Sequence, residues 1–156
     1  MPTLYLTTTI KAPIERVFDL ARSLDLHKIS TGKSREEAIA GRTSGLIKAG
    51  EEVTWRATHL GIRQTLTSLI TRMERPFMFQ DQMTKGAFKS LLHDHLFEQK
   101  GEYTIMKDIF HFESPGGWLG EIFNSLFLTK YLHSVLEERN RVIKEFAESE
   151  RYKEII

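Results

Sequence analysis

The fold is decided by residues 88–113, which read FKSLLHDHLFEQKGEYTIMKDIFHFE. Their side chains alternate between an apolar and a polar set on both sides of Gly101, which is the pattern of two half-buried strands. Lys100 and Gly101 are predicted to be the two turn residues of a β-hairpin. This turn would pair Phe97 with Thr104, His95 with Met106, and His93 with Asp108.

The same alternation continues on either side of this hairpin. From Ser34 to Ser114, segments rich in β-forming residues are separated by Gly or Pro about every ten residues, with no helical period between them. This spacing predicts an antiparallel meander. With an N-terminal segment added, seven strands are predicted, near residues 3–10, 36–42, 51–60, 63–74, 77–86, 88–99 and 102–113.

Helical patterns are confined to three segments. Pro13 suits a first helical turn, and apolar residues recur at helical spacing over residues 13–22, with a further turn over residues 24–27. After Pro115 the period becomes helical again, which predicts a closing helix of about 25 residues. This order of elements predicts an α+β fold in which the long helix crosses the concave face of the sheet.

Composition limits the classes of function. The 156 residues show no internal shift in composition, so residues 1–156 are expected to be one complete domain. Lys and Arg number 22 against 21 Asp and Glu, which disfavours nucleic acid or an anionic membrane as a partner. Cysteine is absent, and no segment approaches the roughly 20 apolar residues of a membrane span. We expect a cytoplasmic protein without stable membrane insertion, whose oligomeric state the sequence does not indicate.

The inner face of the sheet is predicted to be apolar but interrupted by polar residues. A loop over residues 85–87 would pair Asp81 with His93, so that Asp81, His93 and Asp108 form one row across three strands. Such a face is typical of a ligand pocket with a few orienting polar groups, and also of a hydrogen-bonded polar layer in a core. The candidate ligand-binding residues are Trp55, His59, Phe77, Phe79, Asp81, Met83, Leu91, His93, His95, Phe97, Met106, Asp108 and Phe110.

Two kinds of chemistry are open at this row. His93 supported by Asp108 could act as a general acid and base, or the two could be a mutually satisfied pair that fixes strand register. His93 and His95 with Asp81 or Asp108 could hold a metal, but hydrogen bonding is favoured, and neither a metal nor a cofactor is expected.

Several other positions carry simpler expectations. Trp118 is expected to anchor the start of the long helix, and the loop at residues 31–34 to lie near the mouth of the pocket. Surface positions are expected for the remaining histidines, His27, His111 and His133. A solvated helix face is expected for Glu137, Glu138, Arg139, Arg141, Lys144 and Glu145.

The order and spacing of several segments resemble the START-like, or SRPBCC, superfamily, which includes the Bet v 1-like proteins, and in particular its ligand-binding and polyketide cyclase/dehydrase-like subgroup. The resemblance covers nearly the whole chain. It rests on IKAPIERVF at residues 10–18, GEEVTW at 50–55, HLG at 59–61, PFMFQD at 76–81, GAF at 86–88, HDHLF at 93–97, TIMKD at 104–108 and residues 115–120.

This resemblance implies the helix-grip fold, with an internal cavity between the sheet and the C-terminal helix. Characterised members include lipid-transfer domains, plant hormone receptors, polyketide cyclases, Rieske oxygenase subunits and chaperone activators. A Rieske ligand set is excluded because it needs cysteine. The expected function is binding of a small hydrophobic molecule such as a lipid, polyketide or aromatic compound. The alternatives are a cyclase or dehydratase that uses His93 and Asp108, and a chaperone-activator-like protein-interaction module.

Overall fold

A computed structural model describes residues 2–116 and 125–156 of the chain. One sheet contains seven antiparallel strands, in the order β1-β7-β6-β5-β4-β3-β2. The strands are β1 (Thr3–Ile10), β2 (Glu37–Gly41), β3 (Glu52–His59), β4 (Ile62–Glu74), β5 (Met78–Lys85), β6 (Ser90–Lys100) and β7 (Tyr103–Glu113). The helices are α1 (Ile14–Ala21), α2 (Leu24–Ser30), α4 (Ser125–Ala147) and the 3₁₀ helix η1 (Glu150–Glu154).

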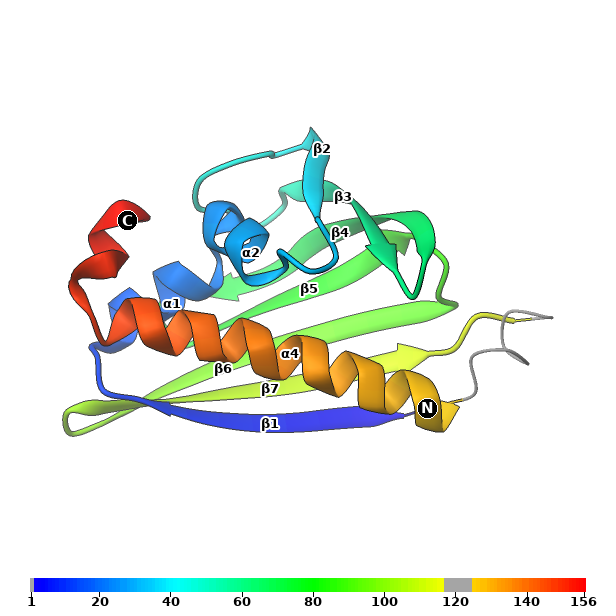
Figure 1. The fold of residues 1–156 in the computed structure, drawn as a ribbon. Helices are drawn as coiled ribbons and strands as arrows, with labels where there is room; N and C mark the ends of the chain where they lie inside the picture. Colours follow the sequence, from blue (N-terminus) through cyan, green and yellow to red (C-terminus); the bar gives the residue numbers. More distant parts are fainter. Residues whose placement is uncertain (1, 117–124) are drawn as a thin grey trace.

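The predicted α+β helix-grip architecture is confirmed. α4 runs across the concave face of the sheet, and α1 and α2 close one end of the space between them (Figure 1). The terminal helix η1 was not predicted, and Trp118 lies outside the described residues. Among the helices described, none combines the length and apolar character that a bilayer crossing requires.

α1 connects the sheet to α4 through a buried aromatic cluster. Its first backbone N–H, at Ile14, donates to Oε1 of Gln99 at 2.7 Å, which supplies the cap that Pro13 cannot. Phe18 on the inner side of α1 is fully buried, and its ring meets Phe79 and Phe97 edge to face at 5.5 and 5.2 Å. Truncation of such a phenylalanine typically costs about 3–5 kcal/mol, so this contact contributes to holding α1 against the sheet.

The predicted register of the β6–β7 hairpin is wrong by two residues. The turn residues are Gly101 and Glu102, because Lys100 pairs with Tyr103, and the glycine adopts the positive φ of 60° that this turn requires. The observed pairs are Phe97 with Met106, His95 with Asp108, and His93 with Phe110. An even shift keeps every side chain on its predicted face, since the side-chain period of a strand is two.

The other predicted register is confirmed. Asp81 pairs with His93 and Phe79 with His95 across β5 and β6. β4 carries two register shifts, at residues 67–68 and 70–72, and bulges of this kind bend a strand. Residues of β3, β4 and β5 face α4 across the cavity that both layers line.

Candidate functional site

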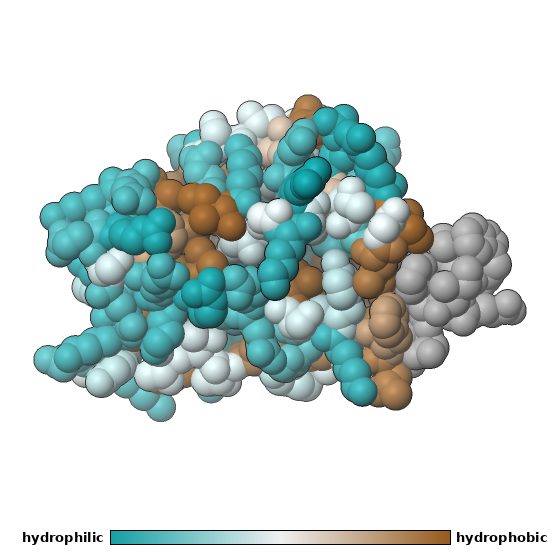
Figure 2. All heavy atoms as spheres, in the orientation of Figure 1, coloured by the Kyte–Doolittle hydropathy of each residue, from teal (hydrophilic) through white to brown (hydrophobic). Residues whose placement is uncertain are grey.

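A cavity of about 320 Å³ lies between the sheet and α4. Its lining is mostly apolar and comes from both layers, including Val53, Trp55, Ile70, Phe79, Leu91 and Phe110 on the sheet side and Leu128, Leu132, Val135 and Leu136 on α4. The exposed lining residues Leu60, Ile62 and Ala87 lie at the β3–β4 and β5–β6 turns, so the cavity opens at that end of the sheet. Figure 2 shows hydrophobic residues at the same end, where α4 begins, and a second hydrophobic patch toward the opposite end of this face.

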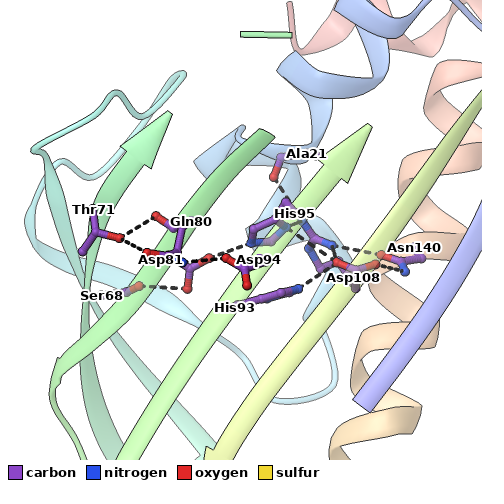
Figure 3. Close-up of polar contacts among 11 residues, drawn as sticks. Ala21, Ser68, Thr71, Gln80, Asp81, His93, Asp94, His95, Asp108 and Asn140 are labelled. Carbon is purple, nitrogen blue, oxygen red and sulfur yellow. Dashed lines mark hydrogen bonds and ion pairs between the residues drawn. The ribbon is translucent and has the colours of Figure 1, made fainter. Parts of the chain in front are cut away.

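The inner wall of the cavity contains a network of polar side chains from β5, β6 and β7 (Figure 3). His93 bonds through Nε2 to Oδ1 of Asp108 at 2.7 Å, and His95 through Nε2 to Oδ2 of Asp81 at 2.6 Å. The two imidazole rings are stacked, with centroids 3.7 Å apart, and His95 stacks on Phe79 at 4.0 Å. The polar row is therefore two His–Asp pairs lying face to face.

α4 completes this network with Arg139 and Asn140. Arg139 is only 6% exposed and donates through Nη1 to Asp108 at 3.4 Å and to the Asn140 side chain at 2.9 Å. Its Nη2 donates to the carbonyl of Ala21 and to Nδ1 of His95, both at 3.3 Å. Asn140 Nδ2 donates to Asp108 Oδ2 at 2.7 Å. Asp108, which is 1% exposed, thus joins three elements of the fold.

The partners of His95 determine its protonation state. A guanidinium can only donate, so Nδ1 of His95 accepts from Arg139 and Nε2 carries the hydrogen that bonds Asp81. Burial, together with the neighbouring His93 and the guanidinium of Arg139, lowers the pKa of His95 to about 3, against the opposing effect of Asp81. Both lines of reasoning make His95 a neutral Nε2–H imidazole near neutral pH.

The carboxylates of the network stay ionised for a shared reason. Burial alone would raise the pKa of Asp81, but the hydrogen bonds that it accepts from His95 and Ser68 bring it down to about 2. Burial would likewise raise the pKa of Asp108, but His93 and Arg139 outweigh that effect and hold it far below its ordinary value. The inner wall therefore contains two carboxylates and one guanidinium.

A second polar cluster in the lining centres on Glu36, which precedes β2. His27 of α2 bonds Glu36 Oε2 through Nε2 at 2.5 Å, and His59 of β3 reaches Oε1 at 3.4 Å. Nδ1 of His59 meets the hydroxyl of Tyr131 on α4 at 2.6 Å. Burial would raise the pKa of Glu36, but the two imidazoles outweigh it and lower that pKa to about 2. His27 also packs against Trp55, at 4.5 Å between ring centroids.

The inner wall also meets the distance criterion for metal ligands. Asp81, His93 and His95 each offer one ligand atom, and these atoms lie within 4.8 Å of one another. Both nitrogens of His95 are already engaged, and the guanidinium of Arg139 lies against Nδ1 and Asp108. A second cation here would be repelled by that guanidinium, so the arrangement favours the hydrogen-bonded pairs.

The structure places most of the predicted ligand-binding residues around the cavity. Those that line it are Trp55, His59, Phe79, Asp81, Leu91, His93, His95 and Phe110. Asp108 lies behind His93, and Phe97 and Met106 belong to the core cluster around α1. Met83 is half-buried against a second core cluster, outside the lining. Phe77 is 61% exposed, because it precedes β5 rather than continuing its alternation.

Several polar lining residues were not expected from the sequence, among them Arg139, His27 and Tyr131. Arg139 was expected on the solvated face of α4, yet it follows Leu132 and Leu136 at heptad spacing on the buried stripe. This spacing indicates a buried position, but the charge of Arg139 led to the opposite assignment. His27 was expected at the surface but bonds Glu36 and packs on Trp55. Tyr131 precedes Leu132 on α4, where no sequence pattern indicates a polar role.

Comparison with known proteins shows the fold. Neither the protein-family models nor the curated proteins gave a match. Among solved structures, TTHA0849 from Thermus thermophilus is similar, with a TM-score of 0.71 and 18% identity over 91% of this chain and 97% of that one. Ara h 8.0201 has a TM-score of 0.65 and 12% identity, covering 94% and 97%. Major latex-like protein 151 from Panax ginseng has a TM-score of 0.62 and 17% identity, covering 90% and 95%. The chain shares the START-like, Bet v 1-like fold with these proteins.

Proposed function

We propose that the protein binds a small hydrophobic molecule in the cavity between the sheet and α4. The observation that carries the proposal is a largely apolar lining, supplied by both layers, in which the charged side chains other than Arg22 belong to the two polar clusters. Pockets of roughly 300 Å³ and more, with this composition, are typical of small-molecule sites. A bicyclic aromatic ligand that buries roughly 250 Å² of apolar surface would gain roughly 6 kcal/mol before the cost of association.

A fluorescent probe and a cavity-filling variant test this proposal. N-phenyl-1-naphthylamine is uncharged and fluoresces when it enters an apolar site, so the wild-type protein should bind it saturably. Leu132→Trp, on the cavity side of α4, should weaken binding at least tenfold, whereas Lys130→Trp on the exposed side of the same helix should not. Equal binding by both variants and the wild type would contradict a site in this cavity. Native mass spectrometry of the purified protein would identify any molecule already bound.

The His93–Asp108 pair supports a second candidate function, general acid/base catalysis of a cyclase or dehydratase type. The carboxylate fixes the imidazole through Nε2, the arrangement that makes the opposite nitrogen a base. Turnover of an enolisable β-keto aromatic substrate, followed by absorbance across pH, tests this. A histidine-governed profile lost in His93→Gln but kept in His111→Gln, on the outer face of β7, would favour the enzyme.

A further inference from the structure

One nitrogen of His93 is left without a partner inside the cavity. Nε2 is bonded to Asp108, and Nδ1 has no hydrogen-bond partner among residues 2–116 and 125–156. Within those same residues, the only fully enclosed side-chain N or O atom that lacks a partner is Nε of Arg56. Nδ1 of His93, on a residue only 5% exposed and in the cavity lining, therefore faces the cavity space. An unpartnered polar atom in this position can accept a hydrogen bond from, or donate one to, a molecule that occupies the cavity.

The chemistry of that partner follows from the bond to Asp108. A carboxylate can only accept, so the hydrogen of neutral His93 is on Nε2 and Nδ1 presents a lone pair. The neighbouring donors cannot satisfy it. Ser68 donates to Asp81, His95 also donates to Asp81, and both Nη atoms of Arg139 are engaged with other acceptors. The missing partner is a hydrogen-bond donor.

The charges around His93 decide whether that donor belongs to an ion. Asp81 and Asp108 are both ionised, and Arg139 is the one guanidinium that touches them in the described part of the chain. His95 adds no charge, because its partners fix it as a neutral imidazole. A carboxylate or phosphate brought against Nδ1 would meet a second lone pair and an excess of negative charge.

We infer that the cavity selects an uncharged, largely apolar molecule whose hydroxyl or N–H group donates a hydrogen bond to Nδ1 of His93. This inference rests on the proposed binding function and narrows its ligand to one chemical class, which includes phenols, enols and alcohols. It excludes fatty acids and other carboxylates as preferred ligands. The cluster of Tyr131, His59 and Glu36 lies elsewhere in the lining and does not supply the partner of Nδ1.

Three ligands that share one ring system test the inference. At about pH 8, each is titrated against protein loaded with N-phenyl-1-naphthylamine. 2-Naphthol carries a donor, 2-methoxynaphthalene lacks one, and 2-naphthoate carries a negative charge. 2-Naphthol should displace the probe roughly threefold to tenfold more tightly than 2-methoxynaphthalene, the worth of one hydrogen bond, and 2-naphthoate should bind most weakly.

A variant pair assigns the preference to His93. His93→Phe should abolish the advantage of 2-naphthol while Asp108 keeps Arg139 and Asn140 as partners. His111→Phe, at a residue that bonds Thr3 on the outer face, should preserve it. Equal affinity for all three ligands, or tightest binding of 2-naphthoate, would overturn the inference about the hydrogen-bond donor. Saturable binding of the probe would still support the proposed binding function in that case. Failure of the probe itself to bind would instead contradict the proposed function. If His93→Phe does not fold, the order of affinities of the three ligands for the wild-type protein still tests the inference.

Discussion

Acid sensitivity of the fold should arise in part from His95, and His95→Phe tests this directly. The folded-state pKa of about 3 lies below the ordinary value of about 6.5, so the unfolded chain takes up the proton first. The proton therefore favours unfolding, and stability falls as pH decreases from about 6.5 towards 3. At about pH 5, which is roughly 1.5 pH units below the pKa of His95 in the unfolded chain, this effect should lower the free energy of unfolding by about 2 kcal/mol.

The assay is urea denaturation at about pH 7.5 and about pH 5, followed by circular dichroism. The free energy of unfolding of the wild-type protein should fall between these conditions, and the fall should be about 2 kcal/mol smaller in His95→Phe. In the wild-type protein Asp81 does not contribute in this range, because its carboxyl titrates below it in both the folded and the unfolded state. His111→Phe is the control, and it should keep the wild-type difference. An equal fall in His95→Phe and wild type would refute the neutral, buried imidazole.

Further predictions concern the polar contacts of the lining. Asp108→Ala should lower the free energy of unfolding by about 3–5 kcal/mol, because it leaves Arg139 buried without its carboxylate partner. The control Glu138→Ala, on the exposed side of α4, should change the free energy of unfolding by less than about 0.5 kcal/mol. Asp108→Leu combined with Arg139→Met should recover part of that loss in the same denaturation assay, since it removes both charges together. Asp108→Ala should also weaken the neutral probe or change its bound orientation, while Glu138→Ala leaves probe titrations unchanged; equal effects of both would contradict the cavity assignment. Glu36→Gln should make the free energy of unfolding less dependent on pH between about 5 and 2. The pKa of the Glu36 carboxyl is lowered to about 2 in the folded protein, so the ionised carboxylate stabilises the fold fully above about pH 5, and this stabilisation is lost as the pH falls towards 2.

The fold could be predicted in detail because two independent patterns agree. Strand alternation and the spacing of turn residues together give the boundaries of the sheet to within about two residues. The hairpin at Gly101 was misregistered because Lys100-Gly101 and Gly101-Glu102 are both acceptable two-residue turns. The error did not alter the inner face, since both choices differ by an even number of residues.

The candidate site could be predicted only on its sheet side. Face assignment brought His93, His95, Asp81 and Asp108 together, because residues two apart on a strand share a face. The contact of His93 with Asp108 was expected from direct pairing of the two residues, but the bond runs diagonally between the strands and depends on side-chain rotamers.

The helical side of the site depends on how far α4 is rotated over the sheet, which no local pattern specifies. Arg139 was assigned to the wrong face because a charged residue on an apolar stripe contradicts the usual rule, and its buried partner is 31 residues away.

The bonds that join Asp108 to β6 and α4 also bear on how this chain can change over evolutionary time. Asp108 accepts from His93, Arg139 and Asn140, so its loss alone would leave a cation enclosed without its carboxylate partner. A lineage can leave this arrangement only by changing positions 108, 139 and 140 nearly together. We expect these three positions to covary as a block, with position 93 free to change alone only where the ligand changes too.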